Sequence, residues 1–339
     1  MIKETIEQLV SGKSISIEQA STVMDEIMEG KPTPAQLGAF LTALRMKGES
    51  PEELAGMATV MRNKALRVEA PGDVVDTCGT GGDRTGTFNI STTAAFVAAG
   101  AGLKVAKHGS RAVSGKAGSA DVLEVVGVKL NLSPEAVKQC IDEVGIGFMF
   151  APAFHLAMKH ALPVRQEIGI RTVFNILGPL TNPARARRQL LGVATPALGE
   201  KLIQVLKLMG AERAMVVHGE DGLDEVTLGG KTHVWDLKDG AITEYDIAPA
   251  DFGLPTFSRN AVRGGDARHN AYLLREVLSG TPGPFKDIVV ANAAAVMVVG
   301  GKAKDFKEGA ALAEQSIKSG AAIAKARQLV ALTQRLATT

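Results

Sequence analysis

The stretch VVDTCGTGGDRTGTFNIST, residues 74–92, decides the fold class of this chain. It opens as a short β-branched run, continues as a glycine-rich loop without lysine, and ends in a Ser/Thr cluster before an alanine-rich helical pattern. A strand that passes through such a loop into a helix is the first half of a βαβ unit. The stretch therefore predicts parallel strands.

The same alternation continues beyond this stretch. The runs DVVDT, LKVAK, IGFMF, LLGVA and RAMVVHG read as strands, and SPEAVKQCIDEVG and ALGEKLIQVLKLMG read as helices between them. Strands that alternate with helices favour a parallel sheet covered by helices. We expect an α/β domain over residues 71–339, with a mostly parallel central sheet flanked by helices.

Residues 1–70 have a different, purely helical pattern. Three capping boxes mark helix starts here, formed by Ser16 with Gln19, Thr33 with Gln36, and Ser50 with Glu53. Apolar residues follow at helical spacing. The sequence predicts a small N-terminal all-helical domain over residues 1–70, with a possible contribution from about 163–185.

Composition limits the classes of function. The chain has 339 residues, 45% hydrophobic, and a formal net charge of +2, without the basic excess of a nucleic-acid-binding protein. Its two cysteines are too few for a disulfide framework or a four-ligand zinc site. The N-terminus lacks a signal pattern, and no apolar run is long enough to span a bilayer. We expect a cytoplasmic protein without nucleic-acid or membrane partners.

The glycine-rich loop has two interpretations. It matches neither GxxxxGK[ST] nor GxGxxG. Gly79, Gly81 and Gly82 allow positive φ angles, which would let N–H groups converge on an anion near a helix that starts at about Ser91. The alternative is a tight strand-to-helix turn that holds no ligand.

A second loop, AKHGSRAVSGKAGSAD, favours the first interpretation. It follows the next predicted strand and carries Lys107, His108, Arg111 and Lys116 among glycines, before a helix that opens near Ser119. Each charge alone is typical of a solvated surface. Two such loops at neighbouring strand ends indicate a multiply phosphorylated ligand.

A third loop is acidic. EDGLDEV follows the strand AMVVHG and places Asp224 and Glu225 side by side. An acidic pair alone usually marks a solvated turn. Beside two phosphate-binding loops it predicts magnesium, which carboxylates hold together with water and substrate phosphates.

The motifs together resemble a known family. GTGGD at 79–83, NIST at 89–92, KHGSR at 107–111, PVRQEIGIRTVFNILGPLTNPA at 163–184 and GLDE at 222–225 are similar to those of the anthranilate phosphoribosyltransferase family, in order and over nearly the whole chain. The resemblance implies transfer of the 5-phosphoribosyl group from phosphoribosyl pyrophosphate (PRPP) to the amino group of anthranilate, with release of pyrophosphate.

The resemblance also implies site residues. The residues implied to hold PRPP are Gly79, Gly82, Asp83, Thr87, Asn89, Ile90, Ser91, Thr92, Lys107, His108, Gly109, Ser110, Arg111, Ala112, Val113, Ser114, Gly115 and Ser119. Two magnesium ions per subunit would be held by Ser91, Asp224 and Glu225. Anthranilate would be contacted by Gly79, Ser110, Arg165 and His155, with His108 along its path.

Three positions carry specific expectations. Arg165 suits a bidentate pair with the carboxylate of anthranilate. His155 is either a site residue or a helix-packing histidine, and His108 is the candidate for a general base. The family usually has Asn at position 110, so Ser110 offers a shorter hydroxyl where the family has an amide.

Two alternatives remain beside this function. A pyrimidine nucleoside phosphorylase has a related fold and phosphate loop, but the acidic pair has no evident purpose in it. A non-catalytic nucleic-acid-binding paralogue would carry a basic stripe, which the near-neutral charge opposes.

The helical segment also bears on assembly. It carries more apolar positions than a short piece can bury alone, among them Ile27, Met28, Leu37, Phe40, Leu41, Leu44, Met57 and Met61. These must cover either the α/β domain or another subunit. The resemblance favours a homodimer joined through the helical domains, and residues 37–44 are then expected to present part of the contact.

Overall fold

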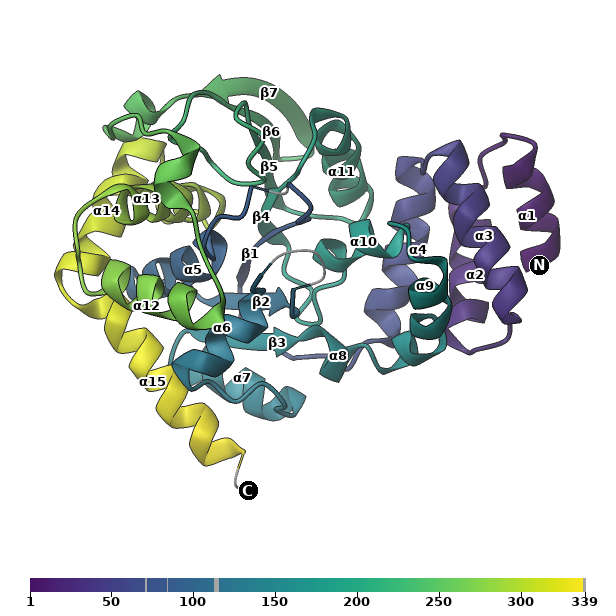
Figure 1. Cartoon of the computed structure of the whole chain (residues 1–339), viewed down its shortest axis with the longest axis horizontal. Coiled ribbons are helices and arrows are strands. Elements are labelled where there is room, and N and C mark those ends of the chain that lie inside the picture. The colour runs from purple at the N-terminus through teal and green to yellow at the C-terminus, as the bar shows by residue number, and fades with distance from the viewer. Residues whose placement is uncertain (71, 84, 113–115, 338–339) are drawn as a thin grey trace.

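The computed structural model describes residues 1–70, 72–83, 85–112 and 116–337. Its centre is a seven-stranded sheet with helices on both faces (Figure 1). The strands are β1 Val75–Gly79, β2 Val105–Gly109, β3 Ile146–Phe150, β4 Arg188–Gly192, β5 Arg213–Gly219, β6 Thr232–Lys238 and β7 Ala241–Ile247. Their spatial order is β3-β2-β1-β4-β5-β6-β7, with the first five parallel and the last two antiparallel. The expected mostly parallel sheet is confirmed.

Alternate residues of the strands enter two separate cores. In β5, Met215 and Val217 belong to one buried cluster, whereas Ala214 and Val216 belong to the other. This is the two-residue period of a strand that is covered on both faces. The helices of this domain are α5 Ile90–Gly100, α6 Ser119–Val126, α7 Pro134–Glu143, α11 Pro196–Leu208, α12 Ala267–Leu278, α13 Pro284–Val299, α14 Phe306–Lys318 and α15 Ala321–Leu336.

The antiparallel hairpin of β6 and β7 was not among the predicted strands. Its turn is Asp239-Gly240, and both residues have positive φ, +50° and +77°. Asp-Gly between alternating apolar residues is a strong hairpin signal, so the sequence held the information. The predicted parallel strands are present, but β1, β2 and β4 are shifted by about two residues from the quoted runs.

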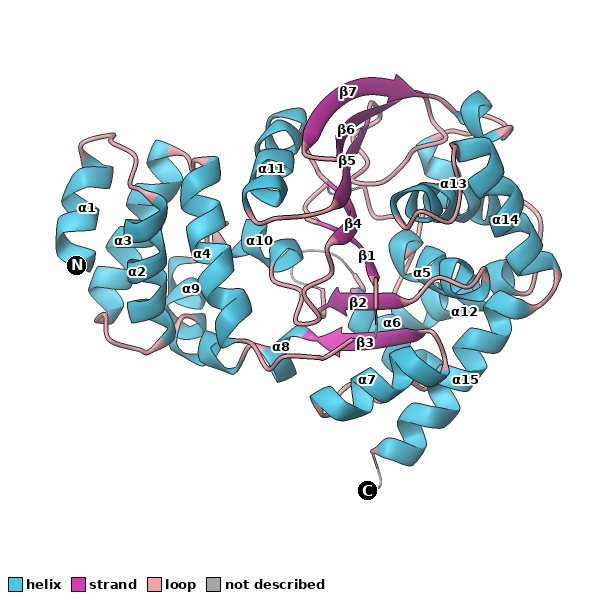
Figure 2. Cartoon of the chain, turned by 180° about the vertical axis from the view of Figure 1, so that it is seen from behind, coloured by secondary structure: helices cyan, strands magenta, loops and turns pink. Residues whose placement is uncertain are grey.

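The helical domain lies at one end of the molecule (Figure 2). It contains α1 Ile2–Val10, α2 Ile17–Met28, α3 Pro34–Lys47 and α4 Pro51–Lys64, and the three capping boxes are confirmed. The sequence did not predict α1, whose N-cap makes no side-chain hydrogen bond. From later in the chain, after α8 Ala151–Phe154, α9 Leu162–Ile168 packs on α3 and α10 Phe174–Leu177 packs on α4. A part of 163–185 thus joins the helical layer, while the boundary at residue 70 stays a prediction.

The apolar residues of the helical domain are buried within the single chain. The eight named above, from Ile27 to Met61, are each at most 5% exposed. They share a core with Leu202 and Leu206 of α11, and α11 packs against α4. The apolar excess therefore covers the α/β domain. The expectation that residues 37–44 present a contact surface is wrong, because Leu37, Phe40, Leu41 and Leu44 face inward.

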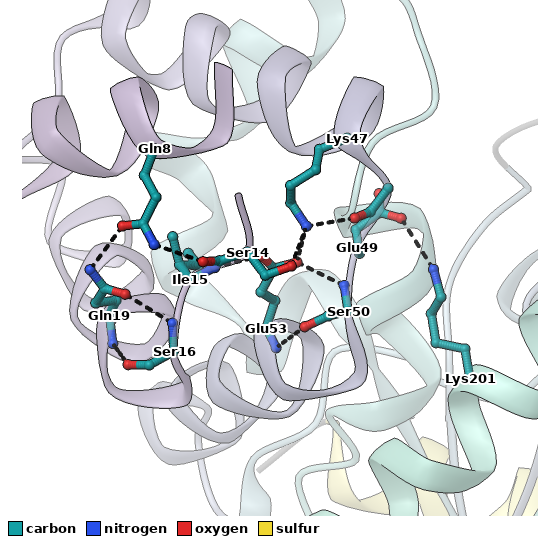
Figure 3. Close-up of polar contacts among 11 residues, drawn as sticks. Gln8, Ser14, Ile15, Ser16, Gln19, Lys47, Glu49, Ser50, Glu53 and Lys201 are labelled. Carbon is teal, nitrogen blue, oxygen red and sulfur yellow. Dashed lines mark hydrogen bonds and ion pairs between the residues drawn. The ribbon is translucent and has the colours of Figure 1, made fainter. Parts of the chain in front are cut away.

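A polar network also spans this junction (Figure 3). Lys47 donates to Glu53 Oε2 at 2.9 Å, and Glu53 also accepts hydrogen bonds from the N–H groups of Ile15 and Ser50. The buried Glu49 carboxylate lies 3.9 Å from Lys201 Nζ of α11. These contacts link the helix ends to each other and to the α/β domain. Within the described ranges, no helix is both long and apolar enough to cross a bilayer.

Candidate active site

The candidate site lies where the sheet changes direction. β1 has β2 on one side and β4 on the other, so the chain order reverses between β1 and β4. The loops after β1, β2 and β5 all leave the sheet at the carboxyl ends of parallel strands. Open α/β sheets bind ligands at such a switch point. The three loops that the sequence singled out therefore meet at one edge.

The glycine loop after β1 is shaped by more than backbone freedom. Gly81 and Gly82 have φ of +64° and +85°, as expected. Gly79 does not have positive φ, so that expectation is wrong. It ends β1, and a Cβ there would lie 2.5 Å from Asp224 Oδ2. Glycine at 79 lets the acidic loop approach.

The acidic loop is attached to both ends of the glycine loop. Gly81 donates its N–H to Asp224 Oδ2 at 2.8 Å, and Ser91 donates its N–H to Glu225 Oε1 at 3.2 Å. Asn292, in the middle of α13, pairs with both the N–H and the carbonyl of Val226. The two carboxylates are thereby held at the N-terminus of α5.

Glu225 is buried and Asp224 is half-buried, and the pKa values of both carboxylates are shifted. Burial raises the pKa of Asp224 to about 7, and the nearby Asp83 adds to the shift. Burial and the neighbouring Asp224 raise the pKa of Glu225 to about 8. A cation would relieve this repulsion, and the hard oxygen donors suit magnesium. Among the described residues no group of three or more His, Cys, Asp or Glu side chains forms a complete metal centre.

The loop after β2 begins with a buried cation. Lys107 is 3% exposed, and its ammonium donates to the carbonyl of Thr77 and lies 3.5 Å from Ser91 Oγ. It therefore lies beneath the predicted metal residues. Its charge also opposes the rise in the pKa of Glu225.

The rest of that loop is anchored by acids of α6. Arg111 pairs with Asp121 and Glu124, at 3.0 and 2.8 Å, so its guanidinium is already committed. The N–H of Ala112 donates to Asp121 Oδ2, and the carbonyl of Ser110 accepts from Ser119 Oγ. Gly109 ends β2. The predicted Val113, Ser114 and Gly115 lie outside the described residues.

The start of α5 presents mainly backbone groups. Ile90 and Thr92 are each 1% exposed, so their side chains face the interior. Asn89 accepts from Asn270 and donates to the carbonyl of Ala117, which holds two loops together. Thr87 pairs through an isolated β-bridge with Arg263.

His108 and His155 form a buried pair. Their ring centres are 5.1 Å apart, and they are 6% and 8% exposed. Burial lowers the pKa of His108 to about 3 and that of His155 to about 4. Nε2 of each ring is buried and has no hydrogen-bond partner in the part of the chain that the structure describes. Both rings are neutral at pH 7, and His155 lies beside a predicted site residue.

Arg165 lies on α9. Its guanidinium stacks over the ring of Phe174 at 5.1 Å. Burial lowers its pKa. The stacked guanidinium keeps its edge available for an anion.

Sequence reasoning missed several residues that shape this edge. Asp76, fully buried in β1, accepts from the N–H of His108 and from Asn182. Asn292 interrupts the apolar run VVANAAAVM, and such a lone polar residue is a signal for a structural hydrogen bond. Arg171 belongs to a quoted motif but was not singled out, because nothing in one sequence places it beside Gly82.

Comparisons with known proteins agree with this geometry. The model described as "Glycosyl transferase family, a/b domain" matches residues 71–323, and "Glycosyl transferase family, helical bundle domain" matches residues 3–65. The anthranilate phosphoribosyltransferase of Dehalococcoides mccartyi is 56% identical over 339 residues, covering 99% of each chain. That of Chloroflexus aurantiacus is 56% identical, covering 98% of this chain and 99% of its own.

The chain belongs to the anthranilate phosphoribosyltransferase family. It is an enzyme of the glycosyltransferase class, and the nucleoside phosphorylase alternative is not favoured.

Solved structures of this family agree. The Thermus thermophilus anthranilate phosphoribosyltransferase superposes with a TM-score of 0.92 at 42% identity, covering 97% of this chain and 99% of its own. The Saccharomyces cerevisiae enzyme in complex with PRPP and Mg superposes with a TM-score of 0.91 at 30% identity, covering 99% and 98%. The anthranilate phosphoribosyltransferase fold thus extends over both domains.

Proposed function

We propose that the polar edge of the sheet transfers the 5-phosphoribosyl group of PRPP to the amino group of anthranilate, in tryptophan biosynthesis. The products are N-(5-phosphoribosyl)anthranilate and pyrophosphate. The observation that carries this proposal is the pair of hydrogen bonds from Gly81 and Ser91 to Asp224 and Glu225. They place hard oxygen ligands beside the glycine-rich loop, as a magnesium diphosphate requires.

PRPP would lie along the loops after β1 and β2. The glycine loop and the N-terminus of α5 offer N–H groups to its phosphates. The residues assigned to it are those that the resemblance implies, from Gly79 to Thr92 and from Lys107 to Ser119. Lys107 acts from within the fold, whereas Arg111 is exposed and paired with acids of α6.

Ser91, Asp224 and Glu225 would hold two magnesium ions per subunit. Bound magnesium would neutralise the negative charge that develops on the leaving pyrophosphate. Magnesium in the yeast complex supports use of the ion here, and the number of ions is part of the proposal. Burial raises the pKa of both acids, and a bound cation would favour their charged forms.

The protein's main task is to align the two substrates. The bond from C1 of ribose to the diphosphate oxygen breaks, the amine nitrogen bonds to C1, and the amine loses a proton to the released pyrophosphate or to water. The aromatic amine is neutral at pH 7 and needs no enzyme nucleophile. His108 is a weak base at a pKa of about 3, so its free Nε2 is suited to accept a hydrogen bond from the amine. We assign no definite general base.

Anthranilate would be contacted by Gly79, Ser110, Arg165 and His155. Arg165, stacked on Phe174, would pair with the carboxylate. The yeast structure with 4-fluoroanthranilate shows that a relative takes an anthranilate analogue, which supports this choice of acceptor.

The homodimer and the cytoplasmic location are also proposals. The homodimer is supported by the resemblance alone, since the apolar face of residues 37–44 is buried within the chain. Sedimentation at micromolar concentration tests it, and a monomer would overturn it. The free thiols of Cys78 and Cys140 suit a reducing compartment such as the cytoplasm.

The deciding experiment follows anthranilate consumption with PRPP and magnesium. Asp224→Asn with Glu225→Gln removes both charges but keeps shape, so turnover should fall by orders of magnitude while the circular dichroism spectrum is kept. Asp246→Asn with Glu244→Gln makes the same changes on the exposed strand β7 and should leave turnover unchanged. Near-wild-type turnover of the first variant at saturating PRPP would falsify the metal assignment.

A further inference from the structure

Arg171 has an unusual position beside the glycine loop. It lies between α9 and α10, the segment that packs on the helical domain. Its guanidinium rests against Gly82, where an added Cβ would overlap the Nη1 and Cζ atoms. A residue of the helical layer thus reaches the turn of the loop after β1.

The guanidinium of Arg171 also lacks a polar partner among the described residues. Its side chain is exposed, and within the described ranges it has neither an ion pair nor a hydrogen bond. Arg111, in the loop after β2, is paired with two acids, and Arg165 stacks on Phe174. Unlike Arg111, Arg171 has no acid partner in the part of the chain that the structure describes, and unlike Arg165 it lies beside the glycine loop.

We propose that Arg171 binds the diphosphate of PRPP and is a positioning residue of this site. This inference rests on the proposed binding of PRPP at the glycine loop. A guanidinium offers paired donors that match phosphate oxygens, and it stays charged at any working pH. Arg171 lies against Gly82, and the neighbouring Gly81 donates its N–H to Asp224. The diphosphate is then held between this cation and the magnesium that the acids bind.

The two arginines of this segment, Arg165 and Arg171, then bind different substrates. Arg165 pairs with the carboxylate of anthranilate, whereas Arg171 serves PRPP and the released pyrophosphate. Both α9 and α10 pack on the helical domain. Diphosphate binding by Arg171 would therefore also favour the approach of the helical domain to the loop after β1.

Steady-state kinetics of Arg171→Ala and Arg165→Ala test this division. A charge-assisted fork contributes about 1.5–3 kcal/mol, which corresponds to roughly tenfold to hundredfold in binding. We expect Arg171→Ala to raise the KM for PRPP and the inhibition constant of pyrophosphate by that factor, with the KM for anthranilate within about twofold. Arg165→Ala should show the opposite pattern, and Arg171→Lys should be intermediate. An equal effect on both substrates, or an effect on anthranilate alone, would overturn the proposal.

Calorimetry with magnesium pyrophosphate gives a readout independent of turnover. The wild type should bind it, and Arg171→Ala should bind it about tenfold more weakly or worse. If the wild type does not bind, the proposed function of the loop fails. If both bind equally, only the role of Arg171 fails.

The two glycines of the loop supply a matched control. Gly81 and Gly82 both have positive φ, but a Cβ at 81 meets nothing within 4 Å. Ala at either position carries the same kind of backbone strain, and only Gly82→Ala displaces Arg171. Gly82→Ala should therefore weaken pyrophosphate binding more than Gly81→Ala, and this excess should vanish when Arg171 is already Ala. An excess that persists without Arg171 contradicts the contact.

Discussion

Asp224 accepts a hydrogen bond of 2.8 Å from the N–H of Gly81, so the acidic loop after β5 is attached to the glycine loop after β1. The strand between them, β4, ends at Gly192, where a Cβ would overlap the carbonyl of Asp224. Thr80 in turn donates its N–H to the carbonyl of Gly192. Glycines at the ends of β1 and β4 thus let the side chain and the backbone of Asp224 lie close against the edge of the sheet.

The first prediction concerns Gly79→Ala. The backbone at 79 tolerates alanine, but the new methyl would lie 2.5 Å from Asp224 Oδ2 and displace that carboxylate. We expect the rise in melting temperature produced by magnesium and pyrophosphate to be lost, with turnover reduced at least tenfold. Gly178→Ala, where a Cβ meets nothing within 4 Å, is the control. An unchanged response of Gly79→Ala to magnesium would show that Asp224 is not a ligand.

A second prediction concerns Ser110, where the family usually has Asn. Its carbonyl accepts from Ser119 Oγ and the N–H of Ala120, so the backbone at 110 is fixed whichever side chain it carries. Ser110→Asn should preserve or lower the KM for anthranilate, and Ser110→Ala should raise it severalfold because a hydrogen-bonding group is lost. If both variants keep the wild-type KM for anthranilate, the side chain at position 110 does not contact anthranilate.

The histidine pair predicts a dependence of stability on pH. Burial lowers the pKa of His108 to about 3 and of His155 to about 4, below the unfolded value of 6.5. Between pH 6.5 and 4 the unfolded chain therefore binds protons that the folded chain does not. The free energy of unfolding should therefore decrease as the pH is lowered from 6.5 to 4, by at most about 1.4 kcal/mol per pH unit for each ring.

Urea titrations of the wild type and of His155→Asn at several pH values check this. Asn keeps a polar side chain but does not titrate, so the slope between pH 6.5 and 4 should become shallower. His233→Asn, on the exposed β6–β7 hairpin, is the control and should keep the slope. A wild-type slope retained by His155→Asn would mean that other groups cause the loss at low pH.

A fourth prediction tests the buried ion pair of the helical domain. Glu53 is 0% exposed, and Lys47 Nζ lies 2.9 Å from its Oε2 (Figure 3). Lys47→Met would leave a buried carboxylate without its counter-charge, which costs about 3–5 kcal/mol. Chemical unfolding followed by far-ultraviolet circular dichroism measures the loss. Lys13→Met, on the exposed turn after α1, should change stability by less than about 0.5 kcal/mol. Equal midpoints for the two variants would mean that Glu53 is held by its backbone donors alone.

The sequence by itself determined the local elements and the chemistry of the loops. Capping boxes at Ser16, Thr33 and Ser50 specify helix starts, because a cap is satisfied within four residues. The strand-loop-helix pattern of residues 74–92 specified a parallel sheet whose loops share one edge. Residue types alone then indicated an anion beside an acidic pair.

Tertiary structure decided what those patterns left open. It buried Leu37 and Phe40 within the single chain, in a core that also contains residues of α11, because an apolar stripe does not record which surface covers it. It placed Arg171 on Gly82, although 89 positions separate the two along the chain. It also shifted the pKa values of Asp224 and His108, because a pKa depends on burial and on neighbours brought together by folding. Local hydrogen bonds depend on residues that are close in sequence, whereas the exclusion of solvent and the contacts between distant residues exist only once the strands have assembled.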